Sequence, residues 1–391
     1  MALFCSCGVR AVFLLATASA TPAALAMAVT DHLALGGAVR LRFDHDPDRD
    51  IEKAGLDVVM LNGAYDDGRW MGAARYRWYG GAHPYQYTRF GGVRFLEYGW
   101  AGLHLDDTQQ IKVGLHNVPF GLQPLFSSTF YETLGNVIGL EDLNQVGASW
   151  QRNGPDWNLQ AGLYARPAWA GHGTGNGTTY AVTVTPADPG VAGGTRNVER
   201  DLVALRLART LHVGEGTGEL GVSFLHSTLH NRDTGRDGER RSAAVHYRHQ
   251  QGRWDTRALL ARQLMTPRNP DGSQHVTFGA YDGTFNVASR GTLGVLDLSY
   301  SVPGRWLHGW VGNVRPYVNY SRFAKSEAGA RTSERAFLGV SASVRALQVA
   351  LEWMHGRNDP YIGGSSYTQS LAEGGIDRWK SQLYMNIGYY F

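Results

Sequence analysis

The stretch WKSQLYMNIGYYF, residues 379–391, alternates large apolar and polar side chains with a period of two. This alternation is typical of a β-strand whose two faces meet different surroundings. Large groups continue on the apolar face to the last residue, where most chains fray into small or polar ones. The strand is therefore expected to lie deep in a sheet or against an apolar phase outside the protein. The apolar face holds Trp379, Leu383, Met385, Ile387, Tyr389 and Phe391.

The first 26 residues carry the pattern of an export signal. Arg10 supplies a positive flank, residues 11–20 (AVFLLATASA) form an apolar core, and residues 24–26 fit a small-x-small cleavage site. We therefore expect a signal peptide over residues 1–26 and a mature domain over 27–391, with a short buried helix as the alternative for the first segment. Cys5 and Cys7 would leave with the signal, so the mature domain would contain no cysteine.

Composition and motifs exclude several classes of protein. The net charge of +3 is too small to indicate nucleic-acid binding. After residue 26 no stretch approaches the ~18 to 20 apolar residues of a membrane helix, and a closed β-barrel is the other structure that can span lipid. No Gly-x-Ser-x-Gly motif, His-Glu-x-x-His motif or paired-carboxylate motif stands out, so neither an enzyme nor a cofactor is predicted.

Alternating segments of about ten residues, the length of a tilted membrane-spanning strand, recur along the chain. Short connections rich in Asp, Asn and Gly then alternate strictly with long ones, as in a transmembrane antiparallel barrel with periplasmic turns and extracellular loops. Two regions leave eighteen strands open, because 303–312 is longer than a normal turn and 274–286 has room for more strands. The sixteen expected strands lie near 33–43, 55–65, 69–79, 93–105, 109–117, 143–152, 156–166, 198–213, 217–229, 240–250, 253–264, 290–302, 313–323, 334–344, 346–356 and 377–391.

On these features the chain resembles Gram-negative outer-membrane porins. Tyr389 and Phe391 resemble the assembly signal of that class, and IKVGLHNVPFG (111–121) is similar to the segment that leads into the third loop of the phosphate-selective porin O/P group. The resemblance implies a homotrimer of sixteen-stranded barrels in the cell outer membrane, with the third loop folded inward. It also implies lipid, lipopolysaccharide and the barrel assembly machinery as partners.

A set of basic residues falls on the polar faces of the expected strands. Because Arg on the lipid face costs roughly 2 to 4 kcal/mol at the midplane, these side chains are expected to point into the lumen. The functional interpretation is a basic pore wall. The alternative is that these residues only solvate the wall and pair with nearby acids. The set comprises Arg40, Arg42, Arg75, Arg77, Lys112, Arg206, Arg248 and Arg315.

The loop over residues 118–142 is expected to form the constriction. Its only charges are Glu132, Glu141 and Asp142, so it lacks the basic residues of the phosphate-selective group and phosphate selectivity is in doubt. Opposite a basic wall these acids would create a transverse field that favours dipolar solutes, with simple anion preference as the alternative. Tyr131, Phe126 and Phe130 are expected to anchor the loop, or alternatively to stack on sugars. A short helix capped by Ser127 or Ser128 is also expected.

The segment DHDPDRD, residues 44–50, offers four carboxylates at every second position, Asp44, Asp46, Asp48 and Asp50. Oxygen-rich loops of this kind bind calcium in some proteins. The EF-hand pattern requires Gly and Glu where this chain has Arg49 and Gly55, so a solvated outer loop, bridged to lipopolysaccharide by divalent ions, is favoured over a calcium site. No other metal site is predicted.

Taken together, these patterns predict a water-filled channel for passive diffusion of ions and small hydrophilic solutes. The first alternative is a plugged or structural barrel that acts as an adhesin, because residues 167–197 are rich in Gly and Thr and long enough to form a plug. The second alternative is an enzyme built on an outer-membrane barrel.

Overall fold

The chain forms a closed antiparallel β-barrel in the computed structural model, which describes residues 27–80, 90–280, 283–362 and 366–391. The expected signal peptide lies outside the described residues. A two-residue strand, β1 (Met27–Ala28), pairs with β2. The sixteen wall strands are β2 (Leu33–Asp46), β3 (Ile51–Asp66), β4 (Trp70–Tyr79), β5 (Arg94–His104), β6 (Gln109–Asn117), β7 (Asn144–Asn153), β8 (Trp157–Pro167), β10 (Asn197–Val213), β11 (Gly216–Asn231), β12 (Asp237–Gln251), β13 (Trp254–Thr266), β16 (Arg290–Tyr300), β17 (Val311–Lys325), β18 (Ser333–Val344), β19 (Leu347–Arg357) and β20 (Lys380–Tyr390).

The first and last wall strands close the barrel. β20 pairs with β19 on one side and with β2 on the other, where Ala38 lies opposite Tyr390. Gly37 and Phe391 also exchange two backbone hydrogen bonds, at 2.7 and 3.0 Å. Because closure pairs both end strands, the backbone polar groups of the wall can be satisfied within a membrane. The predicted sixteen-stranded antiparallel barrel is confirmed.

The alternation in residues 379–391 separates the inside of the barrel from the outside. Gln382, Tyr384 and Asn386 of β20 are buried in the interior, while the intervening apolar residues lie on the outer face. Around the wall this outer face exposes large apolar side chains such as Leu163, Leu260 and Leu296. A ring of exposed aromatic residues marks the end with the short turns, as expected of an interfacial girdle, and it comprises Trp70, Trp157, Trp254, Tyr389 and Phe391.

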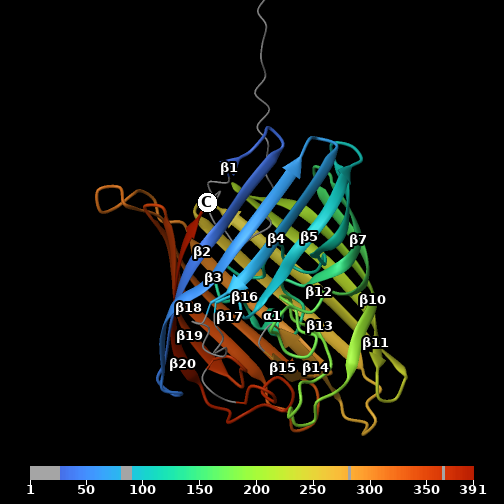
Figure 1. Ribbon diagram of the computed structural model, residues 1–391. Helices are drawn as coiled ribbons and strands as arrows, with labels where there is room; N and C mark the ends of the chain where they lie inside the picture. The colour runs from blue at the N-terminus through green and yellow to red at the C-terminus, as the bar shows by residue number, and fades with distance from the viewer. Residues whose placement is uncertain (1–26, 81–89, 281–282, 363–365) are drawn as a thin grey trace, which may run out of the picture.

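A second, smaller sheet lies inside the barrel. It consists of β9 (Thr183–Val184), β14 (His275–Ala280) and β15 (Gly283–Ala288), with β14 in the middle. Figure 1 shows β14 and β15 within the outline of the barrel, toward the end with the long loops. The extra strands near 274–286 therefore exist but do not join the wall, and the eighteen-strand alternative is wrong.

A hydrophobic core fills the part of the interior that faces β10 to β19. Phe278 and Phe285 of the inner sheet are fully buried there, together with Leu134 of the short helix α1 (Leu134–Val137) and Ile138, which follows it. Apolar inward residues of the wall, among them Phe323 of β17, complete the cluster. The interior is thus filled along one side, and a cavity of about 660 Å³ lies along the other.

The two ends of the barrel differ. Figure 1 shows the C-terminus at the end with the short turns, and the long loops at the opposite end. One connection at the turn end, the orange segment between β16 and β17, extends sideways from the rim. Among the described residues, no helix is long and apolar enough to cross a membrane.

Candidate functional site

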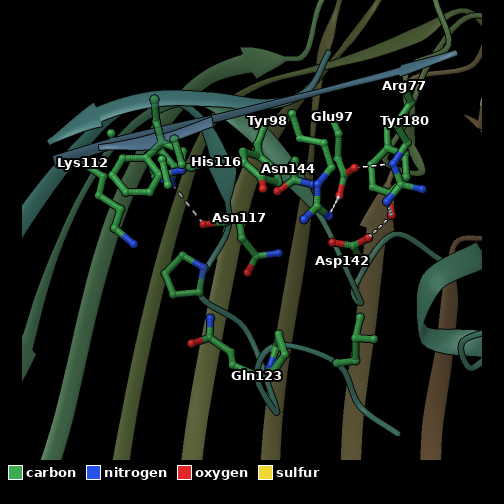
Figure 2. A pocket seen from close by; sticks show the side chains of 18 of the residues that line it. Arg77, Glu97, Tyr98, Lys112, His116, Asn117, Gln123, Asp142, Asn144 and Tyr180 are labelled. Carbon is green, nitrogen blue, oxygen red and sulfur yellow. Dashed lines mark hydrogen bonds and ion pairs between the residues drawn. The ribbon is translucent and has the colours of Figure 1, made fainter. Parts of the chain in front are cut away.

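The candidate site is a cavity of about 660 Å³ in the lumen, between one arc of the wall and the third loop, residues 118–143. Its wall side comes from β2 to β8, and its other side comes from the third loop with contributions from later loops and strands. Figure 2 shows polar side chains from both sides pointing into this space. The third loop lies folded into the barrel, as the resemblance to porins implies.

The wall side carries five of the predicted basic residues. Arg40 and Arg42 come from β2, Arg75 and Arg77 from β4, and Lys112 from β6, and all five line the cavity. The arginines of each pair lie two residues apart because alternate side chains of a strand point to the same face. The strand phase read from the sequence is therefore consistent with their position in the structure.

Most of these cations are paired with acids, of which Asp57 and Glu97 were not predicted from the sequence. Arg40 contacts Asp57 at 3.0 Å, and Arg42 binds Asp44 through two nitrogens. Arg77 and Arg75 share Glu97 of β5, with Arg75 at 3.3 Å. Asp57 and Glu97 fall on lumen-facing positions of their strands, so strand phase alone would have found them.

Lys112 differs from its arginine neighbours. Its ammonium lies 4.5 Å from the centre of the Trp100 ring, a cation–π contact. In the part of the chain that the structure describes, no carboxylate lies within ion-pair distance of it. Lys112 therefore adds a positive charge to the lumen that no neighbouring acid cancels.

The acidic side of the cavity comes from the third loop. Glu132 and Asp142 line the cavity, whereas Glu141 is buried inside the loop and accepts hydrogen bonds from the Phe126 and Thr133 amides at 2.7 and 3.0 Å. Burial, followed by the neighbouring carboxylates, raises the pKa of Glu132 well above its ordinary value. Burial, followed by the negative charge of Glu97, raises the pKa of Asp142 to about 7. Both acids therefore bind protons more readily than in water.

Tyr180, from the long loop between β8 and β10, joins the two sides of the cavity. Its hydroxyl donates to Asp142 at 2.6 Å and accepts from Arg77 at 3.4 Å. The Arg77 guanidinium also lies over the Tyr180 ring, 4.4 Å from its centre. Figure 2 shows this chain of contacts from Glu97 through Arg77 and Tyr180 to Asp142. No sequence pattern pointed to Tyr180, because it lies in an irregular loop.

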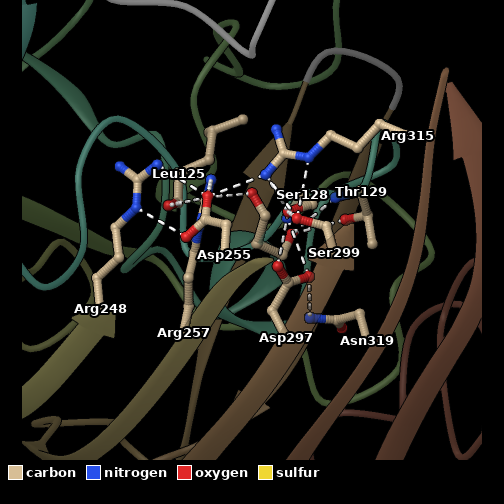
Figure 3. Close-up of polar contacts among 11 residues, drawn as sticks. Leu125, Ser128, Thr129, Arg248, Asp255, Arg257, Asp297, Ser299, Arg315 and Asn319 are labelled. Carbon is tan, nitrogen blue, oxygen red and sulfur yellow. Dashed lines mark hydrogen bonds and ion pairs between the residues drawn. The ribbon is translucent and has the colours of Figure 1, made fainter. Parts of the chain in front are cut away.

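Polar side chains from the opposite arc hold the third loop in place. Figure 3 shows the cluster around Ser128, whose backbone amide and hydroxyl both donate to Asp297, at 3.0 and 2.7 Å. Arg257 donates to the carbonyls of Leu125 and Ser127 at 3.3 and 2.6 Å. Arg315 reaches the Ser128 hydroxyl at 3.2 Å. These contacts satisfy loop backbone groups that burial would otherwise leave unpaired.

Further along the loop, other wall residues act in the same way. Glu352 of β19 accepts hydrogen bonds from the amides of Phe130 and Tyr131 at 2.6 and 3.1 Å. A set of arginines donates to loop carbonyls, namely Arg206 to Gly121, Arg240 to Ile138 and Gly139, and Arg335 to Glu132 and Thr133. The third loop is thus fixed along most of its length to the wall strands β10 to β19.

The predicted basic residues therefore fall into two groups. Arg206, Arg248 and Arg315 lie on the arc that holds the loop, outside the lining of the cavity, and pair with Glu219 or Asp255. Their place differs from the single basic wall expected from the sequence. The reason is that strand phase gives the face of a residue but does not say what lies opposite it.

The aromatic residues of the third loop lie mainly against protein. Phe126 is buried in the interior core, and Phe130 and Tyr131 pack against Tyr384 with ring centres 5.9 and 5.4 Å apart. This packing favours the anchoring role over sugar stacking. The expected helix near Ser127 is wrong in position, because α1 begins later and Thr133 caps it by accepting from the Gly135 amide.

The four aspartates of residues 44–50 do not converge. Asp44 and Asp46 are buried and bind Arg42 and Arg49, and Asp48 pairs with Lys380 at 2.6 Å. Asp50 lies in the turn with φ at 53°. Within the described ranges no group of three or more His, Cys, Asp or Glu residues could hold a metal ion, so the calcium hypothesis is not supported.

A closed sixteen-stranded barrel, an apolar outer face and a polar lumen narrowed by an inward loop define the architecture of an outer-membrane porin. In line with this architecture, residues 67–223 match the family model described as phosphate-selective porin O and P. The match covers about two-fifths of the chain and includes the third loop. The chain is therefore an outer-membrane porin, a channel for small solutes. No curated protein sequence matches it.

Solved structures of the same architecture are similar over nearly their whole length at low identity. The outer-membrane channel DcaP of Acinetobacter baumannii matches with a TM-score of 0.59 and 11% identity, covering 92% of this chain and 97% of that chain. An anion-selective porin from Comamonas acidovorans matches at 0.56 and 12%, covering 92% and 99%. OmpT of Vibrio cholerae, solved in a trimer form, matches at 0.55 and 10%, covering 92% and 99%. At such identities these likenesses establish the fold alone.

Proposed function

We propose that this porin conducts small hydrophilic solutes passively along the β2–β8 side of its lumen. The cavity of about 660 Å³ beside the third loop is the single observation that carries this proposal. Its lining carries many charged side chains among apolar ones, whereas the opposite side of the interior is filled mainly by an apolar core. Water and hydrated solutes would therefore move along the charged arc, past the third loop.

The charge of this lining supports weak anion preference. Six cationic and six acidic side chains line the cavity, so the formal charges cancel at full ionisation. The pKa of Glu132 is raised well above its ordinary value and that of Asp142 to about 7. At neutral pH some of the acids would therefore carry protons, and the balance would become positive. The remaining charges lie on two sides of the lumen, and the electric field between them would also orient dipolar solutes.

The other assignments follow the porin architecture. We infer a homotrimer, since one of the similar structures is described as a trimer. We also infer that the chain has no enzymatic activity. Tyr389 and Phe391 would serve as the assembly signal read by the barrel assembly machinery, and the mature domain would begin after residue 26. Outer-membrane lipid and lipopolysaccharide would surround the trimer.

The test is the zero-current potential of the purified protein in a planar lipid bilayer under a KCl gradient. Stepwise conductance with a small potential that favours chloride is the expected result. A potential that clearly favours potassium would contradict the inferred charge balance. The absence of conductance would instead favour a plugged barrel, which the apolar core and the inner sheet make the second candidate.

A further inference from the structure

The connection between β16 and β17 departs from the short turns around it. The other connections at the turn end are two to four residues long, whereas this one covers residues 301–310. It contains two tryptophans, in the sequence VPGRWLHGW at 302–310. Neither the lumen nor the third loop uses this segment, which we call the rim hairpin.

The rim hairpin is an ordered element. Trp306 and Val311 exchange two backbone hydrogen bonds at 2.8 and 3.1 Å, and the Trp310 amide donates to the Leu307 carbonyl at 3.2 Å. The neighbouring β18–β19 turn supports it from the side. There the Arg345 amide donates to the Trp310 carbonyl at 2.8 Å, and the Arg345 guanidinium lies 3.3 Å from the centre of the Trp310 ring.

A β-bulge sets the direction of the rim hairpin. The pairing of β17 with β18 shifts between Gly312 and Arg315, and Asn313 within the shift has φ at 50°. Bulges bend a strand and change the direction of the chain beside them, especially at the rims of barrels. Figure 1 shows the result, with the orange connection leaning sideways beyond the outer face of the wall.

The rim hairpin presents apolar side chains with cations beside them. Trp306, Leu307 and Trp310 are 46%, 70% and 53% exposed, so three large apolar side chains lie exposed on one short connection. Arg305 lies next to Trp306, and Arg345 lies over Trp310. Tryptophan and arginine together suit the boundary between acyl chains and phosphate headgroups.

The surface of the rim hairpin continues the apolar outer face of the barrel. Trp254 and Tyr300, whose ring centres are 4.7 Å apart, belong to the same rim. Below them, the outer faces of β16 to β18 expose Leu296, Val318 and Leu338. A segment that leans outward from this rim meets the same membrane that covers these strands.

We propose that the rim hairpin lies in the headgroup region of the periplasmic leaflet, with Trp306 and Leu307 at the acyl boundary and Arg305 and Arg345 against lipid phosphates. Its partner is therefore a phospholipid surface. The inference rests on the membrane placement of the barrel and not on whether the barrel conducts.

The test places a fluorescent dye at a single cysteine in the full chain. Cys5 and Cys7 are the only natural cysteines and are replaced by serine, after which Leu307→Cys is labelled with an environment-sensitive dye. The protein is reconstituted into vesicles of phosphatidylethanolamine and phosphatidylglycerol, and the dye is quenched either by doxyl-labelled lipid or by aqueous iodide. Asp107→Cys, in the exposed β5–β6 turn of the same rim, is the water control, and Leu296→Cys is the lipid control.

We expect the dye at position 307 to be quenched by doxyl lipid and to show about fivefold less iodide quenching than the dye at position 107, as interfacial burial requires. Iodide quenching equal to that at position 107 would overturn the proposal, because the rim hairpin would then project into water. Shielding from iodide without doxyl quenching, together with disulfide cross-linking between two copies of the Leu307→Cys variant, would also overturn it and assign the surface to a subunit contact.

Discussion

Among single residues, the pairing of charges matters more to this lumen than their number. Arg42 is held by both oxygens of Asp44, so it changes the lumen potential little. Lys112 has an aromatic neighbour instead of an acidic one, so its full charge acts on passing ions. Selectivity should therefore depend more on Lys112 than on the arginines that outnumber it.

We expect Lys112→Gln to lower the chloride-to-potassium permeability ratio by about twofold, because one charge in a water-filled lumen contributes less than ~1 kcal/mol. The zero-current potential under a KCl gradient measures the change. Lys112→Arg keeps the charge and should preserve the ratio. An unchanged potential in Lys112→Gln would show that Lys112 lies away from the ion path.

Selectivity should also depend on pH through Asp142. Because the pKa of Asp142 is raised to about 7, lowering the pH below that value adds a proton and removes a negative charge from the lumen. Chloride preference should therefore increase between pH 8 and pH 6, on either side of the pKa of about 7. The measurement is the zero-current potential across this range.

Asp142→Asn is the matched control, since it should hold the potential near its acidic value at every pH. Glu132 and Glu97 also face Asp142 and interact with it electrostatically. A pH response that survives unchanged in Asp142→Asn would transfer the titration to Glu132, whose pKa is also raised.

At the scale of elements, the third loop behaves as part of the wall. Its amides and carbonyls are bound by side chains from strands far away in the sequence, including Asp297 of β16 and Glu352 of β19. A loop held at so many points presents Glu132 and Asp142 at fixed positions. The constriction is therefore expected to be rigid on the timescale of ion passage.

Glu352→Ala tests this attachment. The change leaves the buried amides of Phe130 and Tyr131 and the hydroxyl of Tyr317 without their acceptor, at about 1 to 3 kcal/mol for each group. We expect noisier single-channel currents and faster proteolysis within the third loop. Glu215→Ala, in the exposed β10–β11 turn, should change neither. Currents as quiet as those of the unmodified protein would argue against Glu352 as an anchor.

The sequence could predict the wall better than the loop. Alternation in residues 379–391 predicts the two faces of β20 because the period of a strand is independent of its neighbours. The docking of the third loop could not be predicted, because Arg206 and Arg75 both occupy lumen-facing positions although one binds a loop carbonyl and the other lines the cavity. The role of Tyr180 could not be predicted either, because its hydrogen bond to Asp142 forms only where the β8–β10 loop contacts the third loop.

For the whole molecule, the main difference from the predicted barrel is that an apolar core and a small inner sheet fill one side of its interior. β14 (HVTFGA) and β15 (GTFNVA) are almost entirely buried, yet their sequences alternate apolar residues with polar or small ones, so the pattern suits a wall strand as well as an interior one. Only the three-dimensional structure shows that they pack against α1 and the third loop. The open lumen is consequently narrower than a sixteen-stranded wall alone would suggest, and it runs along β2 to β8.

The most direct test of this account is the single-channel conductance of Ala73→Cys, on the lumen face of β4, before and after reaction with a cationic methanethiosulfonate. Cys5 and Cys7 are again replaced by serine, and Leu163→Cys on the lipid face of β8 is the control. We predict stepwise conductance that falls when the thiol introduced at position 73 is modified and does not change when the thiol at position 163 is modified. Absence of conductance, or conductance indifferent to modification at position 73, would contradict the proposed path.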